Sequence, residues 1–261
     1  MTPDLRMVRP DPAPRPDAGA RGPALLYRQT PILMYHRLTR RTGGHPFSLA
    51  VARFRRQLTL LHALGYRSVS PVAFATPAAL PARAVAITFD DGYLDTLTVA
   101  LPLLGEFGFT ATCYLVAGAV GKRAHWTDPA PLMDWSGVDA WLAAGMEVGA
   151  HSLTHPDLTT LREAALREEV AGAKARLEDR LGIAVRSLAY PFNRVDRRVM
   201  AAVADAGYAV GLAGPEIRRS AHALARVDAA HESWAWFGLG LLPRYPALRG
   251  VYRSLIPRRA A

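Results

Sequence analysis

The 261-residue sequence has a single cysteine, Cys113, which excludes an intramolecular disulfide and leaves the redox compartment undefined. Lysine is almost absent: nearly all of the 32 basic residues are arginine, and against 22 acidic residues they give a net charge of +10. Runs of about 18 apolar residues are also missing, so we expect no transmembrane helix. The positive charge permits attraction to anionic partners, but no nucleic-acid-binding motif accompanies it, so nucleic acid is not an expected partner.

Residues 1–27 do not resemble a signal peptide, because they are rich in Pro, Arg, Ala and Gly and contain no apolar stretch of the required length. This composition buries too little apolar surface to offset the entropy of ordering, which predicts a flexible tail. We therefore expect a cytoplasmic protein. Half of the residues are hydrophobic, enough for one domain that we place at residues 28–232.

The C-terminal segment, residues 233–261, mixes aromatic residues with arginines and has no acidic residue from position 243 onward. Such a composition is typical of a segment that lies on an anionic membrane surface. The alternative is an extension that packs on the domain with a solvated basic rim. We expect either peripheral contact with anionic lipid or simple packing here.

Strand-like and helix-like patterns alternate along the domain. Strands are expected at 31–36, 66–70, 84–89, 111–116, 146–150, 185–189 and 208–212, and helices at 48–64, 94–107, 138–144, 161–181 and 197–206. Repeated strand-helix-strand units imply parallel strands with right-handed crossovers. The expected class is α/β, a distorted or incomplete (β/α) barrel of parallel strands. The alternation alone also fits an open sheet, and the barrel is preferred because of the family resemblance described below.

Three polar residues are candidates for helix N-caps. Ser48 precedes the first helical pattern, Thr160 and Glu163 have the spacing of a capping box before the fourth, and Asp196 precedes the fifth. Each is expected to satisfy backbone N–H groups in the first turn of its helix.

Two adjacent carboxylates, Asp90 and Asp91, follow the apolar run 84–89 and precede Gly92. In parallel α/β proteins, sites assemble at the carboxyl ends of strands. Neighbouring side chains on an extended backbone point to different sides, so one carboxylate can ligate a metal while the other stays free as a base. An Asp-Gly pair after a strand is also common in plain turns, so this pattern alone leaves both interpretations open.

Two histidines, His151 and His155, follow another expected strand. In one helical turn this spacing puts both imidazoles on one face, within reach of a common ion. Two histidines and one carboxylate would leave an open position for water, as catalytic zinc sites do. Each motif supplies what the other lacks, so the pair predicts a metal site of Asp91, His151 and His155 with Asp90 beside it.

The motifs Thr88-Phe-Asp-Asp-Gly92 and His151-Ser-Leu-Thr-His155 resemble the first two signature motifs of the polysaccharide deacetylases, the NodB-homology family of carbohydrate esterases. The resemblance extends over roughly residues 31–228. It implies a distorted (β/α) barrel, one divalent metal ion, zinc in preference to cobalt or nickel, and hydrolysis of N-acetyl groups on the amino sugars of a polysaccharide or glycan precursor. An N-acetylated glycan is therefore the expected substrate.

The resemblance also assigns roles to single residues. Asp90 would be the general base that takes a proton from the attacking water. The metal ligands would be Asp91, His151 and His155. A groove wall, with a backbone N–H near its last residue that helps to hold the oxyanion, would consist of Tyr190, Pro191 and Phe192.

Three departures from the family pattern stand out. Ala189 occupies a position where many members carry an arginine thought to brace the catalytic aspartate, and Asn193 occupies one where glycine is common. The late histidine that supplies the general acid is not evident. His36 ends the first strand, and in a barrel the first strand can lie beside the last. His36 is therefore the expected general acid. In the alternative, His36 is structural and the general acid is His222, His231 or solvent.

The sequence is compatible with three functions. Beside N-deacetylation of a glycan stands an alternative within the family, a deacylase or deformylase of a lipid-linked amino sugar. A non-catalytic sugar-binding module on the same fold is the third, and metal content would separate it from the enzymes. Trp126 and Trp135 fit either stacking on a sugar face or anchoring of a loop.

Overall fold

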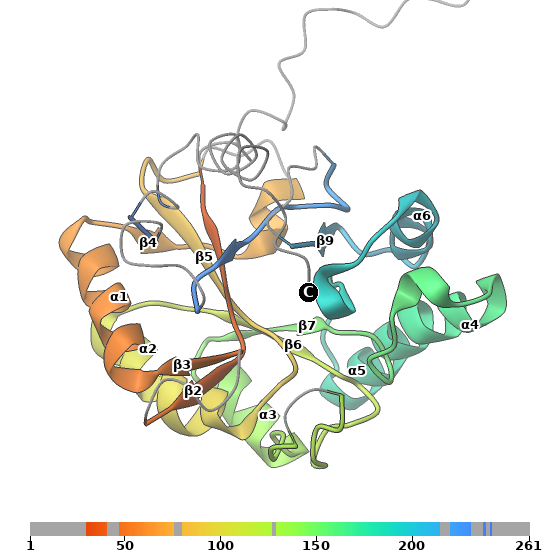
Figure 1. Ribbon diagram of the computed structural model, residues 1–261, viewed down its shortest axis with the longest axis horizontal. Helices are drawn as coiled ribbons and strands as arrows, with labels where there is room; N and C mark the ends of the chain where they lie inside the picture. Colours follow the sequence, from red (N-terminus) through yellow and green to blue (C-terminus); the bar gives the residue numbers. More distant parts are fainter. Residues whose placement is uncertain are drawn as a thin grey trace, which may run out of the picture.

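The computed structural model describes residues 30–40, 47–75, 80–126, 129–214, 220–230, 237, 238 and 241. Within these, a curled sheet of parallel strands is covered on its outside by helices (Figure 1). Its strands are β1 (Ile32–Tyr35), β4 (Arg67–Ser68), β5 (Ala84–Phe89), β6 (Thr112–Leu115), β7 (Glu147–Ala150), β8 (Ser187–Ala189), β9 (Val210–Leu212) and β10 (Val227–Asp228). They run in the order β10-β1-β5-β6-β7-β8-β9, with β4 beside β5. The predicted distorted, incomplete barrel is confirmed.

The barrel is nearly closed by the chain just before β10. Leu224 pairs in parallel with Leu212 of β9, and three residues later Val227 pairs with Leu33 of β1. The strand beside β1 is therefore β10, which the sequence did not predict, whereas the last expected strand, 208–212, lies at the other edge of the sheet as β9. The connecting segment brings Arg226 across the opening between the two edges.

The helices contain two interruptions that the sequence did not predict. Expected helix 94–107 is a π-helical turn, η3, followed by α2, and expected helix 161–181 is divided by a second π-helical turn, η5. Each π turn follows one of the two polar motifs, consistent with the tendency of such bulges to occur at functional sites. The helical segments are α1 (Val51–Ala63), η2 (Pro71–Ala75), η3 (Thr96–Ala100), α2 (Leu101–Phe107), α3 (Trp135–Ala143), η4 (Leu158–Thr160), α4 (Glu163–Arg167), η5 (Glu168–Gly172), α5 (Ala173–Leu181), η6 (Pro191–Asn193) and α6 (Arg197–Asp205).

Two of the three expected helix caps are wrong. Ser48 belongs to β3 (Ser48–Ala50), which pairs with β2 (Arg37–Thr39), so tertiary pairing overrides the capping signal. Thr160 donates its hydroxyl to the carbonyl of Asp157, and α4 begins three residues later, at Glu163, with Arg162 as its N-cap and no side-chain cap. The cap by Asp196 is confirmed, since its carboxylate accepts from the Val199 N–H at 2.8 Å.

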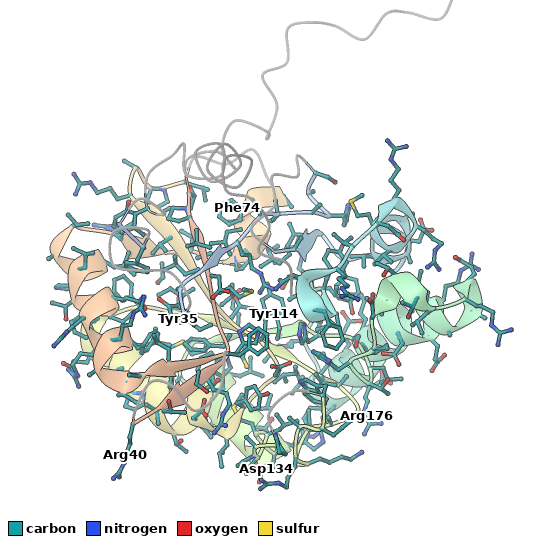
Figure 2. The ribbon with its side chains drawn as sticks, viewed as in Figure 1. Tyr35, Arg40, Phe74, Tyr114, Asp134 and Arg176 are labelled. Carbon is teal, nitrogen blue, oxygen red and sulfur yellow. The ribbon has the colours of Figure 1, made fainter. Side chains whose placement is uncertain are left out.

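Two apolar layers follow from the alternation of side chains along the strands. Tyr35 and its outward neighbours form the larger core between sheet and helices, whereas Tyr114 and Phe74 belong to a smaller cluster inside the curled sheet (Figure 2). Ile32 of β1 and Ala86 of β5 also face this inner cluster. Continuing the same period of two beyond each strand leads to His36 and Asp90, which places polar side chains at the carboxyl end of the barrel interior.

Most of the expected C-terminal extension, 233–261, and all of the expected tail, 1–27, lie outside the described residues. Of the extension, Phe237 and Leu241 are buried in the larger core, and the Leu241 carbonyl accepts a hydrogen bond from the Tyr66 hydroxyl at 3.1 Å. These contacts agree with packing for that part of the extension. In the described part of the chain, no helix combines the length and apolarity needed to cross a bilayer.

Candidate metal and catalytic site

Both carboxylates at the end of β5 are buried, with Asp90 1% and Asp91 4% exposed. The expectation of an extended backbone is wrong at Asp91, whose φ of 72° is left-handed, a region that Asp tolerates better than most residues. This turn keeps the second carboxylate at the same end of the barrel as the first. Gly92 continues it with a φ of 79°, where any other residue would be strained, and a Cβ atom there would also lie 2.7 Å from Leu115 Cδ2 and displace it.

His151 and His155 come together through a loop and not through the expected helical turn. Ser152 and His155 have left-handed φ values of 63° and 69°. Glu169, in the η5 turn, accepts from the backbone N–H groups of Leu153 and Thr154 at 2.9 and 2.8 Å. The loop conformation is thus fixed from outside by a carboxylate that sequence reasoning did not identify.

Ligand atoms of Asp91, His151 and His155 all lie within 4.8 Å of one another. The Nε2 atoms of His151 and His155 face the same oxygen, Asp91 Oδ1, at 3.5 and 3.2 Å. A buried carboxylate and two imidazoles are a donor set that divalent zinc-like metals favour. In the described residues these three are brought together as the sequence pattern predicted.

The tautomer of His151 tests whether these residues fit a cation. Its Nδ1 lies 2.8 Å from the Ala189 carbonyl, which can only accept, so Nδ1 carries a proton. Burial lowers the pKa of His151 to about 4, despite the opposing charges of Asp90 and Asp91, so the ring is neutral at pH 7. Its Nε2 lone pair then faces the Asp91 Oδ1 atom at 3.5 Å, an electrostatic repulsion that a cation bound between the two atoms would relieve. The donor set therefore fits a divalent metal.

Asp90 has a different partner, Arg226, which the sequence analysis missed. The two guanidinium Nη atoms donate to the two Asp90 carboxylate oxygens at 2.7 and 2.8 Å. Arg226 is itself buried, 1% exposed, and its Nε donates to the Ala213 carbonyl at 3.1 Å. Burial alone would raise the pKa of Asp90, but the charge and hydrogen bonds of Arg226 outweigh it and hold the pKa well below its usual range.

Arg226 also accounts for the two departures near β8. Ala189 leaves the position of the usual bracing arginine without a charge, and Arg226 supplies a guanidinium from the segment before β10 instead. The Asn193 side-chain oxygen accepts from Arg226 Nη2 at 2.9 Å, a hydrogen bond that glycine could not make. The only available sequence signal was a lone arginine within the apolar stretch 221–230.

His36 lies at the end of β1 with its Nε2 3.9 Å from Asp90 Oδ2 and its ring 5.0 Å from that of Phe47. The side chain is 12% exposed, so one edge can meet a ligand. Its alternative, His222, is engaged elsewhere: Nε2 lies 2.9 Å from the Tyr208 carbonyl. His231, the other alternative, lies outside the described residues.

The expected groove wall is mostly interior. Tyr190 is buried and donates its hydroxyl to the His222 carbonyl at 2.6 Å, and Pro191 is buried beside it. Phe192 is 46% exposed, has a left-handed φ of 56°, and its ring meets His155 edge to face at 4.8 Å. Of the three side chains, Phe192 alone can present a broad apolar surface to a substrate.

The two tryptophans differ in place. Trp126 stacks on His155, with ring centroids 4.5 Å apart and planes inclined by 16°. Trp135 begins α3 and lies under the guanidinium of Arg180, 5.2 Å from its ring centre. Trp126 thus belongs to the site, and Trp135 does not contact it.

Comparisons with known proteins agree with this arrangement. Residues 78–211 match the sequence model of a family described as polysaccharide deacetylase. The Bacillus subtilis protein YxkH, named as a polysaccharide deacetylase, is 26% identical over 186 residues, which cover 70% of this chain and 63% of YxkH. The chain therefore spans just under two thirds of that relative.

Solved structures share the fold. The Streptococcus pyogenes deacetylase PplD in complex with acetate superposes with a TM-score of 0.67 and 22% identity, covering 87% of this chain and 98% of that one. IcaB from Ammonifex degensii gives a TM-score of 0.68 and 22% identity, covering 84% and 97%. At these identities the likeness establishes the architecture.

Proposed function

The chain belongs to the polysaccharide deacetylase family, and from this premise we propose that it is a metal-dependent hydrolase that removes N-acetyl groups from the amino sugars of a glycan. One observation carries the proposal: a buried three-ligand set lies directly beside a carboxylate that a buried arginine keeps ionised. A sugar-binding module without catalysis would have no use for that charged pair, which favours an enzyme.

Asp91, His151 and His155 would hold the metal, with zinc preferred and cobalt or nickel as alternatives. When bound, the ion supplies Lewis acidity that activates water and polarises the acetyl carbonyl. The protein's part is to keep His151 neutral, with its proton on Nδ1 and its Nε2 lone pair directed at the ion.

Asp90 would act as general base toward the attacking water. The Arg226 guanidinium keeps the pKa of Asp90 low, so the carboxylate is ready to accept a proton throughout the neutral range. Each carboxylate oxygen accepts one hydrogen bond from Arg226 and retains a second lone pair that can accept from the water. The arginine also fixes the carboxylate plane, which orients the base before substrate arrives.

His36 would act as general acid toward the leaving amine. Its Nε2 lies 3.9 Å from Asp90 Oδ2, close enough for both groups to address the same scissile bond from the β1 and β5 side. Phe192, whose ring contacts His155, would provide the apolar wall against which the sugar packs.

The decisive experiment measures acetate release from N-acetylglucosamine oligomers by protein loaded with zinc, cobalt or nickel. The wild type should release acetate, and Asp90→Asn should lose about 10²–10⁴-fold in rate while retaining metal, because the amide cannot take up the proton. Asp196→Asn is the matched control: it keeps an oxygen that can accept from the Val199 N–H at the start of α6 and lies outside the metal set. Undiminished turnover in Asp90→Asn would exclude it as the base.

Peripheral membrane contact by residues 243–261 stays a separate prediction. The arginines in this segment are expected to contribute about 1 kcal/mol each near an anionic surface. Co-sedimentation with anionic vesicles at low salt, before and after deletion of the segment, measures it. Equal sedimentation of the two proteins would leave the segment without a lipid role, and with it the lipid-linked substrate would lose its support.

A further inference from the structure

The two candidate histidine ligands are supported in different ways. His151 donates from Nδ1 to the Ala189 carbonyl at 2.8 Å, which fixes both its tautomer and its ring orientation. His155 is equally buried, 6% exposed, yet no hydrogen-bond partner for its Nδ1 exists among the described residues. Metal-ligating histidines nearly always have such a partner in the surrounding protein. Something else must therefore hold the His155 ring.

Trp126 is placed to do so. Its ring covers His155 in a near-parallel stack, with centroids 4.5 Å apart, while Phe192 meets the same imidazole at an inclination of 71°. The Trp126 indole N–H also donates to Asp91 Oδ1 at 3.0 Å. A single side chain thus contacts two of the three candidate ligands, one through its face and one through its N–H.

The segment that carries Trp126 is itself tied to the turn that carries Asp91. Met133 donates its backbone N–H to the Gly92 carbonyl at 2.9 Å, and Leu132 forms an antiparallel bridge with Tyr93. Trp126 packs against a small buried cluster whose members are Tyr93, Val116, Ala119, Ala124, Ala130 and Leu132. The position of the indole is therefore set by the fold and does not depend on substrate.

We propose that Trp126 is a positioning residue for the metal, an inference that rests on the proposed function of the site. A carboxylate oxygen has two lone-pair directions. The indole N–H occupies one on Asp91 Oδ1 and leaves the other directed toward the two Nε2 atoms. The stacked ring holds the His155 plane so that its Nε2 points to the same place, which replaces the missing hydrogen bond at Nδ1.

The test is the dissociation constant for Co²⁺ and Zn²⁺, measured by competition with a chromophoric chelator in the absence of substrate. Loss of outer-shell support typically weakens metal binding about 10–100-fold. Trp126→Phe keeps the stack but loses the N–H and should fall at the lower end of that range; Trp126→Ala loses both and should fall at the upper end. Trp135→Phe, on α3 and away from the site, is the matched control and should bind as the wild type.

Tryptophan fluorescence provides a second readout. Co²⁺ in the site should quench emission from the wild type and from Trp135→Phe, whereas in Trp126→Phe the quenched fraction should be smaller, because the tryptophan in contact with the candidate ligands is gone. Metal affinities of Trp126→Phe and Trp126→Ala within twofold of wild type would overturn the inference while leaving the proposed function standing. A wild type that binds neither metal would overturn both.

Discussion

Asp90 and Asp91 are neighbours in the sequence, yet their surroundings are opposite in kind. Asp90 faces one permanent cation, Arg226, with both oxygens engaged. Asp91 faces two imidazoles and an indole N–H through a single oxygen. Arginine cannot give up its proton in a protein, whereas a buried imidazole readily becomes neutral.

The difference teaches how one turn of backbone can separate two tasks. Around Asp90 charge is already balanced, so the carboxylate needs no further cation and can accept a proton. Asp91 instead meets imidazole nitrogens and an indole N–H, and burial lowers the pKa of His151 to about 4, so this half of the site offers a buried carboxylate and a neutral imidazole as ligands for an ion. The Asp91 half of the site is therefore suited to bind an ion, whereas in the Asp90 half Arg226 already provides the positive charge.

The largest expected effect comes from the Asp91 half. Substituting Asp91→Ala or His151→Ala should abolish stoichiometric metal binding and all measurable hydrolysis, since two remaining ligands are too few for a stable tetrahedral site. Elemental analysis of the purified variants measures this directly. His222→Ala, which removes a histidine bonded to the Tyr208 carbonyl, should keep its metal. Full occupancy in the ligand variants would mean that the ion binds elsewhere.

The next largest effect, a loss of turnover, is expected from substitution of His36, which lies beside Asp90. His36→Gln should retain metal and fold, and lower turnover by about 10²-fold or more, because the leaving amine loses its proton donor. The alkaline limb of the pH-rate profile should shift or vanish while the acidic limb stays in place. Wild-type turnover across the whole pH range in this variant would make His36 structural.

Removing the ion pair between Asp90 and Arg226 should mainly change the free energy of unfolding and the pH dependence of activity. Arg226→Met leaves a buried carboxylate without its cation, which typically costs about 3–5 kcal/mol. It should also raise the pKa of Asp90 and move the acidic limb of the activity profile to higher pH. Arg198→Met, which removes guanidinium hydrogen bonds from α6 to the backbone carbonyls of Thr159 and Leu161, is the control for loss of an arginine.

The stability loss in Arg226→Met has a defined pH dependence. In the wild type the folded-state pKa of Asp90 is depressed, so the pair stabilises the fold above the pKa of the unfolded aspartate. That contribution fades as pH falls toward the folded-state pKa. Denaturant titrations should therefore show a wild-type advantage that is largest near pH 7 and shrinks in acid; an advantage independent of pH would point to packing instead of charge.

The smallest effect is expected from Asn193→Gly. This substitution removes the oxygen that accepts from Arg226 but relieves the left-handed backbone at φ 56°. Losing one hydrogen bond to a charged group is worth about 1.5–3 kcal/mol, partly offset by the backbone. The acidic limb should move in the same direction as in Arg226→Met and by less. A shift as large as that of the arginine variant would contradict this ranking.

The parts of the site that the sequence revealed are local. Asp90 and Asp91 adjoin one another, and the two histidines are four residues apart, so short motifs with a strand before them were sufficient. The alternation of strands and helices was equally legible because each element buries one face over several residues.

What the sequence could not reveal depends on contacts between distant segments. Arg226 is one arginine among many, without a motif, and only closure of the barrel gives it a partner. Ser48 has the chemistry of a helix cap but is taken into a strand pair by β2. The loop that brings His155 beside His151 depends on Glu169, and no local pattern indicates this contact or the left-handed φ of Asp91.

The pair between Asp90 and Arg226 joins positions 136 residues apart, and this separation bears on how the protein folds. Closing a loop of that length has a large entropic cost, and the chain loses this entropy before the contact can stabilise the fold. During synthesis β5 emerges long before the arginine, so the interior end of the barrel must stay hydrated until residues 224–228 dock. The pair should therefore form after the rate-limiting step, and Arg226→Met should accelerate unfolding while leaving the folding rate nearly unchanged.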